Sequence, residues 1–232
     1  MNAMTGFGPV VWAADIAAYP DAVRALMGPM AQVELEADDF ACLTGEAKAI
    51  TPDSQDKLDE ALADFQSTGA FLRLGLCSFK LGPGRLLPIY TGTQAALTLA
   101  QRNARVQTVA RAMVSAKKKR LLYLRPHLNI PRWSEFRVFI KNRSVIGVSQ
   151  YHCDQRYLQI HHYAAQIENT IQVLLQHLLP ALHVDNTVVD LSIDPEQKTA
   201  LLLELNPFVR RTGSGLFSWT KPGDFDGRMR FL

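Results

Sequence analysis

The chain has 232 residues, of which 47% are hydrophobic and 20% are charged. This composition is typical of a folded globular protein and excludes an intrinsically disordered chain. The formal net charge of +3 is too small to indicate binding to nucleic acid or to an anionic membrane through bulk charge.

Cysteine content and the start of the sequence indicate the compartment. Cys42, Cys77 and Cys153 are too few and too widely spaced for a disulfide framework or for a zinc site of the CxxC type. The first basic residue is Arg24, so the sequence start lacks the positive region of a signal peptide. No apolar run approaches the ~20 residues of a membrane span. We therefore expect a cytoplasmic protein without membrane contact.

Residues 1–69 are expected to form an N-terminal α/β domain whose internal order the pattern leaves open. Within it, Thr51 and Pro52 are residue types that favour a helix start. Apolar side chains at positions 58, 61, 62 and 65 then recur at helical spacing. We predict a helix that ends before Gly69.

The next segment, Ala70–Leu81, reads AFLRLGLCSFKL and alternates apolar with other residues, which predicts a strand that ends in a Ser-containing loop. It carries the cations Arg73 and Lys80. These cations either contact phosphate groups or are solvated, and the pattern alone does not decide. The Gly- and Pro-rich residues 82–92 that follow predict a loop or lid.

A single helix is predicted from Thr93 to about Ala116, with apolar residues on one side. The cations of Lys117–Arg120 follow its end, where they complement the helix dipole; a solvated helix end is therefore favoured over a nucleic-acid patch. Leu121–Arg125 is predicted to be a short strand.

Two hairpins are predicted in the remainder of the chain. Glu135–Lys141 and Val145–Tyr151 flank a polar tetrad, and the apolar runs VVDLSI and ALLLELN flank DPEQKT. Apolar residues between Ile167 and Leu178 predict a helix between the hairpins that ends at Pro180. Thr212 and Ser214 follow in a small-residue stretch that either binds a ligand or forms a tight loop.

The second hairpin contains candidate metal ligands. Glu204 and Asn206 are two residues apart and therefore project from the same face of a strand, with Leu203 and Leu205 expected to point into a core. Closure of the hairpin would place Asp190 opposite Glu204. Two carboxylates and an amide oxygen suit Mg²⁺. A solvated acidic hairpin is an equally open alternative from this stretch alone.

Several motifs in a fixed order carry a resemblance to a known family. EFRVFIKNRSVIGVSQY, then VVDLSI, then LLLELNPFVRRTGSGLFSW are similar to segments of the cell division cycle protein 123 family, a branch of the ATP-grasp superfamily. Upstream, FLRLGLCSFK resembles that family's first phosphate-contacting segment, and LLYLR resembles its adenine-side hinge. The matched segments run from about Phe71 to Trp219.

The resemblance implies an α+β ATP-grasp fold in which two α+β lobes hold ATP between them. The first lobe would comprise residues 70–125 and the second residues 126–232, including the metal-binding hairpin. The residues that the resemblance implies for binding phosphate are Arg73, Lys80, Arg125 and Arg137, and those for holding Mg²⁺ are Asp190, Glu204 and Asn206. This chain departs from the eukaryotic members at Arg73, where they have lysine, and at Glu204, where they have aspartate.

Two functions are compatible with such a site. The first is an ATP-dependent ligase that joins an unknown carboxylate to an amine through an acyl phosphate, with Arg137 and Lys80 as catalytic residues. The second is a non-catalytic ATP-binding chaperone, because the eukaryotic family members assemble translation initiation factor 2 and so act on a protein partner. The sequence shows no sign of accommodating such a partner, so we favour the ligase. No nucleic-acid partner is expected.

Overall fold

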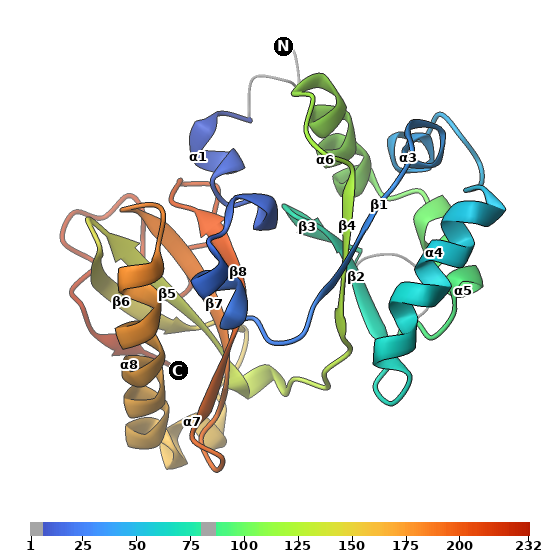
Figure 1. Ribbon diagram of the computed structural model, residues 1–232. Coiled ribbons are helices and arrows are strands. Elements are labelled where there is room, and N and C mark those ends of the chain that lie inside the picture. Colours follow the sequence, from blue (N-terminus) through green and yellow to red (C-terminus); the bar gives the residue numbers. More distant parts are fainter. Residues whose placement is uncertain (1–6, 80–86) are drawn as a thin grey trace. The chain divides into compact units, whose positions relative to one another are not determined.

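The structure is a computed structural model that describes residues 7–79 and 87–232 (Figure 1). The chain forms two compact units: the first is built from Pro29–Leu128, and the second from Gly8–Gly28 together with Asn129–Leu232. The lobe boundaries at residues 69 and 125 stay a prediction. No helix in the described ranges is long and apolar enough to cross a membrane.

The first unit contains a four-stranded antiparallel sheet with the strand order β1-β4-β2-β3. Its elements are β1 (Ala31–Glu34), α3 (Ala37–Thr44), α4 (Pro52–Leu62), a 3-10 turn (Ala63–Phe65), β2 (Ala70–Leu74), β3 (Cys77–Ser78), α5 (Gly92–Ala100), α6 (Ala104–Ser115) and β4 (Leu121–Pro126). Leu72, Leu74, Leu122 and Leu124 are fully buried in this sheet. The strands therefore form the centre of this unit's core.

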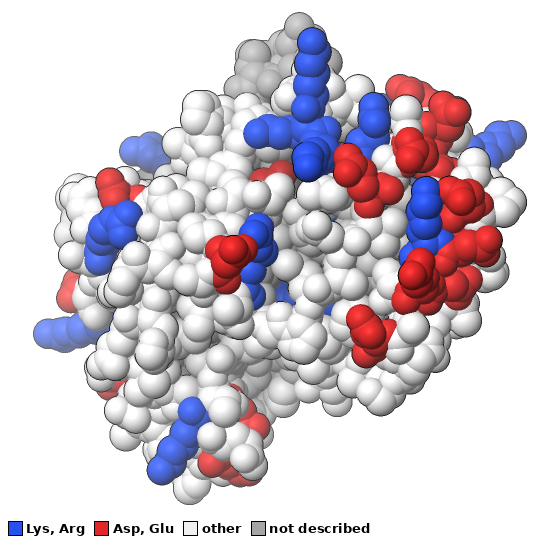
Figure 2. Space-filling model, in the orientation of Figure 1, with Lys and Arg blue, Asp and Glu red and all other residues white. Residues whose placement is uncertain are grey.

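The helix predicted after Thr51 is confirmed as α4. The Thr51 hydroxyl accepts a hydrogen bond from Ser54 N at 3.3 Å, and Leu58 and Leu62 are buried. The opposite side of α4 carries exposed carboxylates, and Figure 2 shows acidic side chains gathered over α3 and α4. This helix has the amphipathic pattern that its sequence spacing predicts.

The structure corrects two predicted elements of the first unit. The helix predicted from Thr93 to Ala116 is two helices, α5 and α6, because the Asn103 side chain accepts hydrogen bonds from Arg105 N and Val106 N and starts a new helix there. Within Ala70–Leu81 there are two strands, β2 and β3, which pair as a hairpin, so Ser78 lies in a strand and not in the predicted loop. Lys80, Leu81 and residues 82–86 of the predicted lid lie outside the described residues.

The second unit contains a five-stranded sheet with the order β8-β7-β5-β6-β9, in which only β9 runs parallel to its neighbour. Its elements are α1 (Pro9–Trp12), a 3-10 turn (Ile16–Ala18), α2 (Asp21–Ala25), a 3-10 turn (Arg132–Ser134), β5 (Glu135–Lys141), β6 (Ser144–Gln150), α7 (Leu158–His162), α8 (Ala164–Ala181), β7 (Thr187–Asp194), β8 (Thr199–Pro207) and β9 (Met229–Arg230). Both predicted hairpins and the helix predicted between them are therefore confirmed.

The two faces of this sheet are covered by different parts of the chain. Alternate residues of β5 and β7, such as Val138 and Val189, are fully buried on one face, against which α8 packs with its apolar side. On the other face, Phe139 and Val188 pack with Phe217 and, around them, with the aromatic residues Phe208, Trp219 and Phe225. Both faces are therefore covered at the centre of the sheet, where the charged residues Arg137 and Asp190 are buried.

A β-bulge in β8 corrects the predicted core residues of the second hairpin. The pairing of Asp190 with Glu204 is followed by pairing of Leu191 with Leu202, which leaves Leu203 as the extra residue. Leu202 and Leu205 are consequently buried, whereas Leu203 is only partly buried. The strict alternation that predicted Leu203 in the core fails at this single inserted residue.

Candidate functional site

Three strands bring charged residues together on one face of the second unit's sheet. Arg137 on β5 lies directly opposite Asp190 on β7, which lies directly opposite Glu204 on β8. Directly opposite residues project to the same face, and so does Asn206, two positions beyond Glu204. The structure therefore groups four of the residues that the sequence predicts for the metal and phosphate site.

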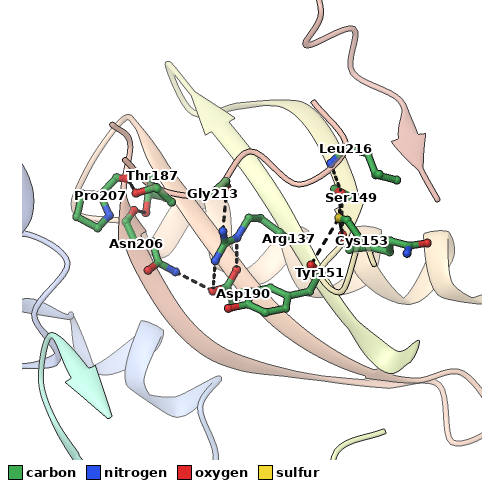
Figure 3. A network of polar contacts seen from close by, with 12 residues as sticks. Arg137, Ser149, Tyr151, Cys153, Thr187, Asp190, Asn206, Pro207, Gly213 and Leu216 are labelled. Atoms are coloured by element: carbon green, nitrogen blue, oxygen red, sulfur yellow. Dashed lines mark hydrogen bonds and ion pairs between the residues drawn. The ribbon is translucent and has the colours of Figure 1, made fainter. Parts of the chain in front are cut away.

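Arg137 and Asp190 form a buried ion pair with two hydrogen bonds (Figure 3). Arg137 Nε donates to Asp190 Oδ1 at 2.7 Å, and Nη2 donates to Oδ2 at 2.8 Å. The residues are only 9% and 3% exposed, respectively. Two parallel bonds of this kind fix the orientation of both side chains, because the planar guanidinium matches the carboxylate.

Three neighbouring groups complete the contacts of this pair. Asn206 Nδ2 donates to Asp190 Oδ2 at 2.8 Å, and Arg137 Nη1 donates to the carbonyl oxygen of Gly213 at 2.9 Å. The guanidinium carbon of Arg137 lies 4.7 Å from the centre of the Tyr151 ring, a cation–π contact. Figure 3 shows the Asn206 and Tyr151 side chains and the Gly213 carbonyl group of the loop after β8 around the Arg137–Asp190 pair.

Burial and charge shift the proton affinities in this cluster. Burial, together with the negative charge of Glu204, raises the pKa of Asp190 to about 6, although the hydrogen bonds from Arg137 and Asn206 oppose that rise. Burial alone would lower the pKa of Arg137, but its bonds to Asp190 outweigh this effect and raise that pKa. Arg137 therefore stays charged at every physiological pH.

The small-residue stretch after β8 forms a tight loop against the strands. Gly215 has a φ of +59°, and a Cβ atom at this position would overlap Ser149 Oγ. That hydroxyl accepts from Leu216 N at 2.9 Å and donates to Gln150 O at 2.7 Å. Thr212 donates to the carbonyl oxygen of Pro207. The structure shows a tight loop here, whose Gly213 carbonyl oxygen accepts a hydrogen bond from Arg137, and ligand binding by Thr212 and Ser214 stays a prediction.

The first unit has its own pair of buried arginines. Arg73 on β2 pairs with Tyr123, and Arg125 on β4 pairs with Phe71, so both arginines project from the same face of that unit's sheet. They are 4% and 7% exposed, respectively. Arg73 Nε donates to the carbonyl oxygen of Leu74 at 3.2 Å. The structure thus places these two predicted phosphate-binding residues together, while their role stays a prediction.

The donor atoms around Asp190 fit a hard divalent cation. Asp190, Glu204 and Asn206 supply two carboxylates and one amide oxygen, the ligand types that Mg²⁺ prefers when waters and phosphates complete its coordination. No cluster of three or more His, Cys, Asp or Glu residues with metal-binding geometry occurs among the described residues. Both carboxylate oxygens of Asp190 accept hydrogen bonds from Arg137 or Asn206, and the role of these three residues as metal ligands stays a prediction.

Sequence reasoning missed two residues of the cluster. Tyr151 directly follows the last residue of β6 and covers the Arg137 guanidinium, and Gly213 contributes only a backbone carbonyl. The even spacing of Ser149 and Tyr151 was the available signal for the tyrosine, because it places both on the Arg137 face. No pattern in the sequence indicates a particular backbone carbonyl.

Comparison with solved structures identifies the fold. The chain matches Cdc123 from Schizosaccharomyces pombe with a TM-score of 0.77 and 18% sequence identity, and the match covers 96% of each chain. The chain therefore has the fold of that protein, and the predicted α+β class is confirmed by the two sheets with their helices. The D123 family model matches residues 97–223, and the chain belongs to the D123 family.

Named relatives share part of this sequence. A translation initiation factor eIF2 assembly protein from Vanderwaltozyma polyspora is 30% identical over 105 residues, covering 43% of this chain and 27% of that protein. A protein of the same name from Xenopus tropicalis is 33% identical over 99 residues, covering 42% of this chain and 29% of that protein. The chain thus matches less than a third of the length of these curated relatives.

The relatives' names correct the predicted activity. These proteins are named for the assembly of a translation initiation factor, and none of these names describes a ligase. The prediction of an ATP-dependent ligase with a carboxylate and an amine as substrates is therefore wrong. The predicted alternative, an assembly protein, agrees better with the family.

Proposed function

We propose that this chain is a non-catalytic assembly factor that binds ATP and Mg²⁺ and acts on a protein partner in the cytoplasm. The observation that supports the partner most directly is the name of its relatives, which assemble the translation initiation factor eIF2. We infer a partner of the same kind, a translation initiation factor or one of its subunits.

The oxygen-bearing side chains of the charged cluster are the basis for including Mg²⁺ in this proposal. Asp190, Glu204 and Asn206 would hold Mg²⁺, which would neutralise the phosphate charge of a bound nucleotide. Arg137 carries one positive charge, and Asp190 and Glu204 carry one negative charge each. The three side chains together therefore carry one net negative charge. A cluster with only a small negative excess suits Mg²⁺ that arrives together with ATP.

The arginines and lysine predicted from the sequence keep their proposed roles in nucleotide binding. Arg73 and Arg125 lie on one face of the first unit's sheet, and Arg137 lies beside Asp190 in the second unit. Lys80 lies outside the described residues. We propose each of the four as a phosphate-binding residue of its own unit, because guanidinium and ammonium groups are the usual partners of phosphate.

The state of Arg137 favours binding over turnover. Phosphoryl transfer is accelerated by cations directed at charge that develops in the transition state. Three N–H donors of Arg137 are bonded to Asp190 and Gly213, and the Asp190 carboxylate balances its charge. An arginine held in this way contributes to the shape of the site but offers little additional stabilisation to a reacting phosphate.

Nucleotide binding is best tested at Glu204. Glu204→Gln keeps the size of the side chain and removes its charge, and we expect it to weaken Mg²⁺-dependent ATP binding by about tenfold, equivalent to ~1.4 kcal/mol. The measurement is calorimetric titration with ATP in the presence of Mg²⁺ and in EDTA. Glu196→Gln is the matched control, because Glu196 lies on the same hairpin and is exposed. Equal affinities in both variants would refute the metal role.

The partner is tested by assembly. Translation initiation factor 2 from the same organism is reconstituted from separate subunits with and without this chain, and the yield of complete factor is measured by gel filtration. We expect the chain to raise the yield when Mg²⁺ and ATP are present, and Glu204→Gln to raise it less. An unchanged yield with the wild-type chain would refute the proposed partner.

A further inference from the structure

Strand β8, which carries two of the proposed metal ligands, lies at the edge of its sheet. It is the first strand in the order β8-β7-β5-β6-β9, so no further strand pairs with its outer side among the described residues. Backbone groups on such an edge need other partners. Residues 8–28 provide them: Leu202 N on β8 donates to the carbonyl oxygen of Leu26 at 3.0 Å.

The second partner of this edge is the hydroxyl group of Tyr19. It accepts from Leu205 N at 2.9 Å and lies 3.2 Å from Leu205 O, to which it donates. A phenol has one hydrogen and two lone pairs, so it can serve both backbone groups of one residue. The same oxygen lies 3.0 Å from Ala14 O, a second acceptor for its hydrogen. One side chain thus takes the place of a neighbouring strand at Leu205.

The backbone segment that carries Tyr19 is held in place by its own contacts. Asp15 accepts from Ala17 N at 2.9 Å and starts the 3-10 turn before Tyr19, and Tyr19 N donates to Ile16 O at 3.0 Å. Ile16 is fully buried, and Tyr19 is 2% exposed. His183 Nε2 lies 2.8 Å from the carbonyl oxygen of Ala13, which ties this segment to the end of α8. The hydroxyl therefore has little freedom to move.

Leu205 lies between the two proposed ligands on β8. Its side chain is buried on the face covered by α8, whereas Glu204 and Asn206 project from the opposite face. The bulge at Leu203 interrupts the regular pairing with β7 immediately before this point. Because the bulge loosens the ladder there, the orientation of the next peptide units depends on whatever holds the outer edge.

We propose that Tyr19 is a positioning residue for the metal site: its hydroxyl fixes the Leu205 backbone and thereby the directions in which Glu204 and Asn206 project. This inference rests on the proposed binding of Mg²⁺ with ATP. It assigns a role to residues 8–28, for which the sequence pattern predicted no function. Partners that orient metal ligands without touching the metal typically change metal affinity by about 10–100-fold when lost.

The test is Tyr19→Phe, which keeps the ring in its packing and removes only the hydroxyl. Mn²⁺ is the probe, because its binding together with ATP is measured directly by electron paramagnetic resonance. We expect about tenfold weaker Mn²⁺ binding in Tyr19→Phe, with unchanged ATP affinity in EDTA. Tyr157→Phe is the matched control, because Tyr157 is also buried in the second unit and its hydroxyl also accepts a hydrogen bond, from Arg132 Nε at 3.2 Å, but it is the N-cap residue of α7.

The outcomes separate this inference from the proposed function. If Tyr19→Phe loses stability but binds Mn²⁺ as the wild type does, the hydroxyl is only a structural contact, and the inference is wrong while the proposed function stands. If the wild-type chain binds ATP without any dependence on a divalent ion, both are wrong.

A measurement on the wild-type chain covers the case in which Tyr19→Phe does not fold. If Tyr19 and the ion act on the same peptide unit, binding of Mg²⁺ and ATP slows hydrogen exchange at the Leu205 amide, because coupling between two sites is reciprocal. Exchange at Leu205 that is unaffected by Mg²⁺ and ATP would overturn the inference without any variant.

Discussion

The two faces of the second unit's sheet are made by the same strands and stabilised in different ways. On the α8 face, side chains such as Val138 and Leu191 are fully buried among other apolar groups. On the opposite face, Arg137 and Asp190 are nearly as buried but are satisfied by a few directed bonds. Stability is therefore spread over many apolar contacts on the α8 face, whereas around Arg137, beside the aromatic cluster of Phe139 and Phe217, it is concentrated in a few bonds.

The two faces are therefore expected to respond differently to amino-acid substitutions. An apolar core loses stability roughly in proportion to the volume removed. A buried ion pair fails as a unit, because removal of one partner leaves the other charge without compensation. A single substitution on the polar face is therefore expected to cost more than a larger one on the apolar face.

The largest expected loss of stability comes from a substitution in the Arg137–Asp190 pair. Asp190→Ala removes the carboxylate that binds Arg137 and should lower the free energy of unfolding by about 3–5 kcal/mol. Urea denaturation measures this change. The double variant Arg137→Met with Asp190→Leu should recover most of the loss, because no buried charge remains. A double variant as unstable as the single one would contradict the comparison.

The next effect tests the apolar face. Leu178→Ala truncates a fully buried side chain on α8 and should cost ~3 kcal/mol, through lost burial and the cavity that remains. Val173→Ala on the same helix, at a residue that is 47% exposed, should stay within about 0.5 kcal/mol of the wild type. A Leu178→Ala loss larger than that of Asp190→Ala would reverse the proposed order of the two faces.

A smaller effect concerns the loop that covers the polar face. Gly215→Ala adds a methyl group that overlaps Ser149 and forces a left-handed backbone on alanine, and it should cost about 2 kcal/mol. Gly223→Ala isolates the backbone contribution, because Gly223 also has a positive φ, of +74°, but open space around its Cβ position. That control should cost ~1 kcal/mol. Equal losses would show that the overlap with Ser149 has no effect.

The smallest effect is a dependence on alkaline pH. Burial and the charge of Asp190 raise the pKa of Tyr151, so the unfolded chain loses this proton near pH 10 before the folded chain does. Because the unfolded state then binds fewer protons, the contribution is present below pH ~10 and is lost as the pH rises above it. Tyr151→Phe should weaken this decline in unfolding free energy. If the unfolding free energies of the wild type and of Tyr151→Phe decline in parallel between about pH 9 and 11, the prediction is wrong.

Regular periodicity made much of the fold predictable. The alternation in Glu135–Lys141 and the apolar runs of the second hairpin gave the strands, and helical spacing gave α4 and α8. The register that places Asp190 opposite Glu204 also followed from closing the hairpin around its polar tip. These features depend on local pattern, which a single sequence contains.

Features that depend on one residue or on distant contacts were not predictable in this way. The bulge at Leu203 changes which leucine is buried, and Asn103 divides a helix that periodicity would continue. The predicted phosphate role of Arg137 gave no indication that its guanidinium would bind Asp190. That pair forms between residues 53 positions apart, and neither residue type alone specifies its partner.

The bond between Tyr19 and Leu205 joins residues 186 positions apart and has a consequence for synthesis of the protein. Tyr19 is translated well before the β8 edge that its hydroxyl caps, because Leu205 lies 186 positions further along the chain. Until then, residues 8–28 have no β8 to pack against. A fragment that starts at Asn129 would contain every strand of the second sheet, yet its β8 edge would lack this cover and would be open to pairing with other copies.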